Sequence, residues 1–211
     1  RDVHRLKKMV QEQYPGIPII LMGHSMGSFL VRQYIGLYGA GLAGAIVMGT
    51  GDQPNVVLGA GKLVCKIIAT FKGWEYRSKL VDSMAAGGYD KQVKGEGESW
   101  LSRNRANVEQ YKKDSLSGYM FTVNAYYHMF SGMSKMNKQE KSGMIPRDLP
   151  IYFVAGDKDP VGNCGKAVEF SIPGAKMKVL RTKGEQNEQI RRNSDRKKSS
   201  GCIRRRKSGK K

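Results

Sequence analysis

The chain has 211 residues, is 39% hydrophobic and carries a formal net charge of +19. That length is enough for one well-packed domain with an insertion. No apolar run approaches the roughly 20 residues that span a bilayer, which excludes a membrane-spanning helix, and the basic start is not typical of a signal peptide. Three widely spaced cysteines without a C-x-x-C pair indicate a reducing compartment. We therefore expect a cytoplasmic protein with no metal site and no cofactor.

The first predicted elements are a helix over residues 2–13 and a strand over 17–22. Apolar side chains recur along one face of the helix, at Val3, Leu6, Met9 and Val10. Charged residues cover the opposite face, and Pro15 and Gly16 end the segment. This periodicity is typical of an amphipathic helix. The apolar, partly β-branched residues that follow favour a strand.

A Gly-x-Ser-x-Gly turn follows the strand directly and is the most informative motif of the chain. Its five residues are Gly23, His24, Ser25, Met26 and Gly27. A helix is predicted next, over 26–38, and this order is typical of a nucleophile elbow rather than of an accidental glycine-rich turn. We expect the turn to strain the backbone at Ser25 and to lift its hydroxyl out of the sheet. Both flanking glycines are expected because a side chain there would collide with the neighbouring strand and helix.

A second strand is predicted over 42–48, where a short apolar run ends in a Gly-Thr-Gly sequence. Alternating buried strands and helices indicate a parallel sheet with right-handed crossovers. The predicted fold class is therefore α/β, with residues 1–52 as the first segment of the core.

The periodicity changes after the second strand, and helical and loop patterns dominate the next part of the chain. We interpret residues 53–145 as a helical insertion that forms a lid. Its first helix is predicted over 56–72, with lysines interleaved among apolar residues. Strand character returns at 149–155 and, more weakly, at 177–180. Residues 146–180 are therefore predicted to complete the core.

A loop with two acidic residues, Asp157 and Asp159, follows the predicted strand at 149–155. A carboxylate at the end of a late strand can orient a catalytic imidazole and stabilise its charged form. We favour Asp159, which lies further into the loop, whereas Asp157 is expected to brace the turn. The competing interpretation is that both aspartates only form the turn.

The histidines of the chain are His4, His24 and His128. None of them follows Asp159, although this scaffold has the chain order Ser, acid, His. His24 is expected to be packed or to line a substrate pocket. His128 is expected to pack within the lid, and His4 to lie on an exposed helix face. A serine hydroxyl without a general base is a poor nucleophile, so we expect the chain to be inactive or nearly so.

These features together resemble the monoacylglycerol lipase and lysophospholipase branch of the α/β-hydrolase fold, also described as serine aminopeptidase S33-like. The resemblance covers about residues 2–168, which correspond to the second half of a full-length enzyme. It rests on the elbow sequence at 23–27, Phe-Val-Ala-Gly-Asp-Lys-Asp-Pro-Val-Gly at 153–162, and lid sequences at 100–103 and 121–127.

The resemblance implies Ser25 as the nucleophile, Asp159 as the triad acid and the backbone N–H of Met26 as an oxyanion donor. The implied activity is hydrolysis of a carboxylic ester, such as a monoacyl lipid, through an acyl-enzyme. Family members also carry early strands with an oxyanion loop and, after the last strand, a histidine and an amphipathic helix. Because these features are not found in this sequence, we expect a truncated member of the family, in which residues 181–211 are translated out of frame.

Two basic segments suggest partners other than a small-molecule substrate. Residues 181–211 contain 13 Lys or Arg against 3 Asp or Glu, and so few apolar side chains predict a disordered tail. Its charge predicts non-specific binding of polyanions. It has no aromatic residue to stack on a base, so no specific nucleic-acid function is expected. The lysines of 56–72 favour a solvated face or, alternatively, transient contact with an anionic membrane surface.

Two further functions therefore compete with that of an inactive serine hydrolase. The chain could be a non-catalytic protein that binds a lipid or small molecule in its lid pocket. The least favoured alternative is a polyanion-binding protein that acts through residues 181–211.

Overall fold

The computed structural model describes residues 1–85, 88–89, 92–93 and 99–163, together with the strand at 176–180. The disorder and polyanion binding predicted for residues 181–211 lie outside these described residues. Within them, no helix is long and apolar enough to cross a bilayer.

Four parallel strands form the sheet, in the spatial order β1-β2-β3-β4. They are β1 (Ile20–His24), β2 (Gly44–Met48), β3 (Ile151–Gly156) and β4 (Lys176–Leu180). Every neighbouring pair is parallel, which confirms the predicted α/β class. The first strand begins and ends later than predicted. Pro18 cannot donate to a ladder, whereas Gly23 and His24 pair with the end of β2.

Six helices are described, and two of them have the predicted bounds. They are α1 (Asp2–Gln13), α2 (Met26–Tyr38), α3 (Asn55–Lys72), α4 (Lys79–Ala85), α5 (Arg105–Lys113) and α6 (Val123–Lys141). The last two begin with side-chain caps, since Asn104 accepts from the N–H of Ala106 and Thr122 from that of Ala125. The segment predicted as an insertion is thus helical in its described part, and the structure leaves its role as a lid untested.

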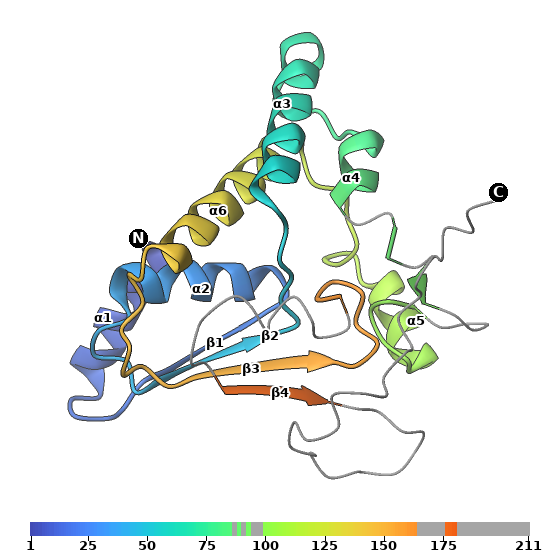
Figure 1. The fold of residues 1–211 in the computed structure, drawn as a ribbon. Coiled ribbons are helices and arrows are strands. Elements are labelled where there is room, and N and C mark those ends of the chain that lie inside the picture. The colour runs from blue at the N-terminus through green and yellow to red at the C-terminus, as the bar shows by residue number, and fades with distance from the viewer. Residues whose placement is uncertain (86–87, 90–91, 94–98, 164–175, 181–211) are drawn as a thin grey trace, which may run out of the picture.

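The buried apolar side chains form two clusters. In the first, α2 packs on the sheet through residues such as Ile35, Val47 and Phe153. In the second, α3, α4 and α6 pack on one another around Cys65 and Phe130. Figure 1 shows α2 along the sheet and α3 rising away from it, so the second cluster lies off the sheet.

A buried ion pair connects these two clusters. Arg32 on α2 is fully buried and donates from Nε and Nη2 to the carboxylate of Glu140 on α6, at 2.7 and 2.8 Å. Its Nη1 donates to Oγ1 of Thr50 at 3.1 Å and to the carbonyl of Gly51 at 2.7 Å, just after β2. One guanidinium therefore joins α2, α6 and the segment that leaves the sheet.

Glu140→Ala is expected to lower the free energy of unfolding by about 3–5 kcal/mol, because it leaves a buried guanidinium without its counter-ion. Equilibrium denaturation in urea measures this change. The matched control is Glu109→Ala, which removes the exposed partner of Arg105 on α5 and should change the same free energy by less than about 1 kcal/mol. Similar losses in both variants would contradict the importance of the buried pair.

Candidate active site

Ser25 lies in the connection between β1 and α2, with φ of 53° and ψ of −122°. Among the described residues, only Ser25 and Asn163 combine a side chain with a positive φ. Such a conformation costs about 1–3 kcal/mol and persists where the surroundings enforce it. Here the N–H of Ser25 donates to the carbonyl of Met48 at 3.0 Å, which ties the turn to the end of β2. The residue is exposed, as the sequence predicted for a strained serine.

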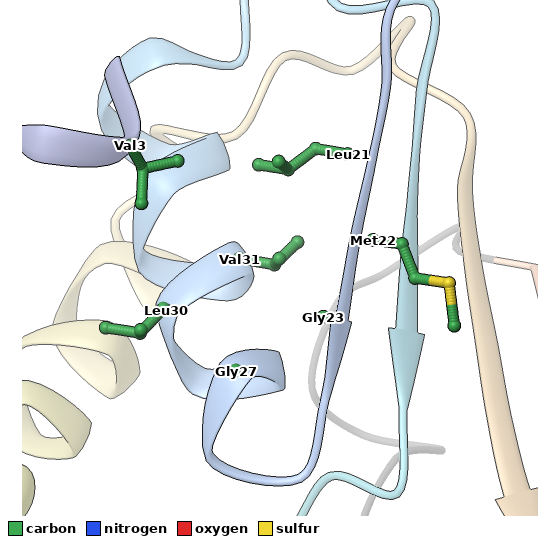
Figure 2. Close-up of a pocket in the computed structure, with 7 residues that line it drawn as sticks. All are labelled: Val3, Leu21, Met22, Gly23, Gly27, Leu30 and Val31. Carbon is green, nitrogen blue, oxygen red and sulfur yellow. The ribbon is translucent and has the colours of Figure 1, made fainter. Parts of the chain in front are cut away.

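The two glycines of the motif differ in what surrounds them. A Cβ on Gly23 would lie 2.6 Å from the carbonyl carbon of Gly27 and 2.6 Å from Cγ2 of Val31, so the expected collision is confirmed there. Figure 2 shows Gly23 on β1 opposite the first turn of α2. For Gly27 the expectation is wrong within the described part of the chain, where an added Cβ has no atom within 4 Å apart from its chain neighbours and the backbone of its own helix. Only the strand-side glycine is required by packing.

Asp159 lies at the same edge of the sheet as Ser25. The register aligns His24 with Met48 and Met48 with Val154, so the segments that follow β1, β2 and β3 emerge together. Asp159 Oδ1 accepts from the N–H of Val161 at 2.9 Å. Burial raises the pKa of Asp159, and the Val161 N–H and the charge of His24 lower it in part. The carboxylate is thus half-buried, with one oxygen committed to its own loop.

The bracing of the turn expected of the neighbouring candidate Asp157 stays a prediction. Its Oδ1 is buried and has no hydrogen-bond partner among the described residues, whereas Asp159 makes a hydrogen bond within the loop. In an Asx turn the side chain of an Asp or Asn accepts a hydrogen bond from the backbone N–H two residues later. Asp159 stands in this position relative to Val161. The preference for Asp159 as the acid remains a prediction.

Gly49, directly after β2, brings the imidazole of His24 and the carboxylate of Asp159 into one neighbourhood. A Cβ built on Gly49 would lie 3.4 Å from His24 Nε2 and 3.7 Å from Asp159 Oδ2. The φ of Gly49 is 57°, a conformation that glycine adopts readily. Sequence reasoning identified the Gly-Thr-Gly sequence only as the end of a strand. The proximity of Gly49 to the candidate site could have been predicted, because this glycine directly follows the strand next to the one that ends in the elbow.

Tyr89, from the predicted insertion, also lies near this acid and was not predicted. Burial raises the pKa of its hydroxyl, and the charge of Asp159 raises it further. The ring packs at 5.3 Å from that of Trp100. No pattern in the sequence around Tyr89 indicated this position, because it depends on how the insertion returns to the sheet.

The other two histidines lie away from this edge. His4 was expected to be exposed, but it is half-buried and its Nδ1 is 3.0 Å from the hydroxyl of Tyr34. Its ring stacks on Tyr38 at 4.2 Å, because α1 packs on α2 through this face. His128 is exposed on α6 and contacts the ring of Tyr127 edge-on.

The N-terminus of α2 points its first N–H groups at the strained turn. Met26 is the first residue of this helix, and the N–H groups of a first helical turn have no acceptor within the helix. They also lie at the positive end of the helix dipole. An oxyanion beside Ser25 would therefore meet a favourable field and a donor at Met26.

An apolar cavity of about 160 Å³ lies between α1, β1 and α2. Its lining residues are Val3, Leu21, Met22, Gly23, Gly27, Leu30 and Val31. Neither Ser25 nor Asp159 lines this cavity, so it does not include the two candidate catalytic residues. Within the described ranges no group of three or more His, Cys, Asp or Glu could hold a metal ion.

Comparisons with known proteins agree with this geometry. A family model for serine aminopeptidase, S33, matches residues 1–179. A thermostable carboxyl esterase from Bacillus coagulans is 28% identical, with a TM-score of 0.74 over 87% of this chain and 62% of its own. No curated protein gives a significant match.

Two further solved structures share the fold at lower identity. A lipase in its open form has a TM-score of 0.73 at 18% identity, over 87% of this chain and 62% of its own. A soluble variant of monoglyceride lipase from Saccharomyces cerevisiae has a TM-score of 0.58 at 18% identity, over 86% and 58% respectively. The chain thus spans less than two thirds of the length of these relatives.

Gly23→Ala is expected to lower the free energy of unfolding by about 1–3 kcal/mol, because the new methyl group overlaps backbone atoms of Gly27. Urea denaturation measures the loss. Gly27→Ala is the matched control, and it should be neutral or stabilise by up to about 1 kcal/mol, since alanine replaces a helical glycine in open space. A Gly23→Ala variant as stable as the wild type would show that the two segments do not approach closely.

His24→Asn is expected to raise the pKa of Asp159 further, because it removes the positive charge that lowers this pKa. A pH titration followed by the carboxyl ¹³C shift of Asp159 measures the change. His128→Asn removes an exposed imidazole on α6 and should leave the titration of Asp159 as it is. If the two variants titrated alike, His24 would not lie beside this carboxylate.

Proposed function

Because the chain belongs to the serine aminopeptidase S33 family of α/β-hydrolases, we propose that its site is that of a serine hydrolase of carboxylic esters. Ser25 is the nucleophile and Asp159 is the triad acid. The observation that carries the proposal is the strained, exposed Ser25 at the sheet edge where Asp159 emerges.

In this reaction the hydroxyl oxygen of Ser25 attacks the carbonyl carbon of the ester, and the serine proton passes to the departing alcohol by way of a base. The N–H of Met26 donates to the oxyanion that forms during the attack. Water then cleaves the acyl-enzyme and releases the acid. Asp159 orients the base and stabilises its positive charge.

Monoacyl lipids are the proposed substrate class within the carboxylic esters. The proteins with similar structures include a carboxyl esterase and a monoglyceride lipase, both of which act at an ester carbonyl. A half-buried carboxylate and a helix N-terminus beside Ser25 suit a neutral ester carbonyl that becomes negative in the transition state.

We further propose that the 211 residues by themselves turn over esters very slowly, because no imidazole is placed as the base. His4 is held by Tyr34 in the contact of α1 with α2, and His128 is exposed on α6. The His24 ring lies over Gly49, and a base that assists Ser25 must be within hydrogen-bond reach of its hydroxyl.

Added imidazole tests this proposal by supplying the missing base. Labelling with a fluorophosphonate probe is expected to be slow in buffer and about tenfold or more faster in imidazole, in line with the contribution of a general base. Ser25→Ala should abolish the labelling and Asp159→Asn should weaken the rescue. Mass spectrometry of the labelled peptide identifies the modified residue.

Ser142→Ala is the control, because Ser142 is exposed at the end of α6 and should label as the wild type does. Rapid labelling of Ser25 without imidazole would contradict the proposed inactivity. Labelling that survives Ser25→Ala would remove Ser25 as the nucleophile. No labelling under any condition would favour the non-catalytic, ligand-binding alternative.

A further inference from the structure

Ser28 is a fully buried serine in the first turn of α2, three residues after the strained Ser25. Its Oγ donates to the carbonyl oxygen of Ser25 at 2.5 Å. Its backbone N–H donates to the same oxygen at 2.9 Å. One residue therefore gives the Ser25 carbonyl two hydrogen bonds, one from its side chain and one from its backbone.

The carbonyl that accepts these two bonds belongs to the same peptide unit as the N–H of Met26. A peptide unit is planar and trans, so the carbonyl of Ser25 and the N–H of Met26 turn together and point in opposite directions. Hydrogen bonds on the carbonyl side therefore fix the direction in which Met26 donates. Met26 is itself exposed at the start of α2, where its N–H has no acceptor within the helix.

The two peptide units that flank Ser25 are held by different parts of the fold. The unit before it is fixed by β2, because the N–H of Ser25 donates to the carbonyl of Met48 at 3.0 Å. The unit after it is fixed by Ser28. A positive φ persists only where the surroundings enforce it, and the hydroxyl of Ser28 is one of the groups that do so.

The acceptor distinguishes this bond from the ordinary bond of a serine within a helix. A helical serine often donates to a carbonyl three or four residues earlier, as Ser131 of α6 does to Tyr127 at 2.7 Å. The acceptor of Ser28 is instead the N-cap carbonyl of α2. Hydrogen bonds in a chain polarise one another, so a bond to this carbonyl strengthens the N–H of the same peptide unit as a donor.

We propose that Ser28 is a positioning residue for the oxyanion donor. Its hydroxyl holds and polarises the peptide unit between Ser25 and Met26, so that the Met26 N–H is directed at the oxygen that becomes negative when Ser25 attacks an ester. A donor that is fixed before the reaction needs no reorganisation as the charge develops. This inference rests on the function proposed for Ser25.

The Ser28→Ala variant tests the proposal because it removes the hydroxyl and leaves the backbone N–H as a donor to Ser25. Fluorophosphonate labelling of Ser25 in imidazole is expected to be about three- to tenfold slower than in the wild type. The loss should be smaller than the roughly hundredfold or more that follows removal of a whole oxyanion donor. The matched control Ser131→Ala removes a hydroxyl-to-carbonyl bond on α6 and should label as the wild type does.

The backbone amide of Met26 provides a readout that a loss of stability alone would not move. Its ¹⁵N chemical shift depends on the hydrogen bonds that the preceding carbonyl accepts. Ser28→Ala is therefore expected to move this resonance upfield without any probe present, and Ser131→Ala should leave it in place. Ser28→Thr keeps a hydroxyl and should bring both the shift and the labelling rate back towards the wild type. Circular dichroism checks that each variant is folded.

A folded Ser28→Ala variant that labels at the wild-type rate would overturn the proposal, and so would an unchanged Met26 resonance. Equal slowing in the two alanine variants would also overturn it, because the effect would then not depend on the Met26 peptide unit. Failure of the wild type to label in imidazole is a different outcome. It would contradict the function proposed for Ser25, and the inference about Ser28 with it.

Discussion

The close approach between Gly23 and the first turn of α2 is the constraint on which the candidate site depends. The strand passes the helix so closely that a single methyl group at Gly23 would overlap the backbone of Gly27. To follow this path, the chain reverses within one residue, and Ser25 takes a positive φ. The exposed hydroxyl and the helix N-terminus beside it are consequences of that reversal, because both depend on where α2 begins.

The other residues of the site lie at the same edge of the sheet, because the carboxyl ends of parallel strands meet there. The ends of β1, β2 and β3 lie in register, and the imidazole of His24 and the carboxylate of Asp159 both lie close to Gly49. The Arg32–Glu140 pair fixes α6 to α2. The helices that pack off the sheet are therefore held relative to the strained turn, and α3 extends away from the sheet.

Local patterns predicted much of this fold. The bounds of α1 and α2 and the parallel order of the strands followed from periodicity and the elbow motif. The first strand was predicted too early in the chain, and the other errors concern contacts between distant segments. Gly27 has free space around it, and His4 packs on α2. Neither fact can be predicted from neighbouring residues, because both depend on how far a second segment lies from the residue and on which side chains that segment carries. The approach of Tyr89 to Asp159 was missed for the same reason.

A crystal structure of the chain tests the central claim most directly, because it gives the backbone of residue 25 and the position of the 159 carboxylate together. The account predicts a positive φ at Ser25, between a strand and a helix, with Asp159 emerging at the same edge of the sheet. A Ser25 inside a regular helix or strand, or an Asp159 at the opposite edge, would contradict it.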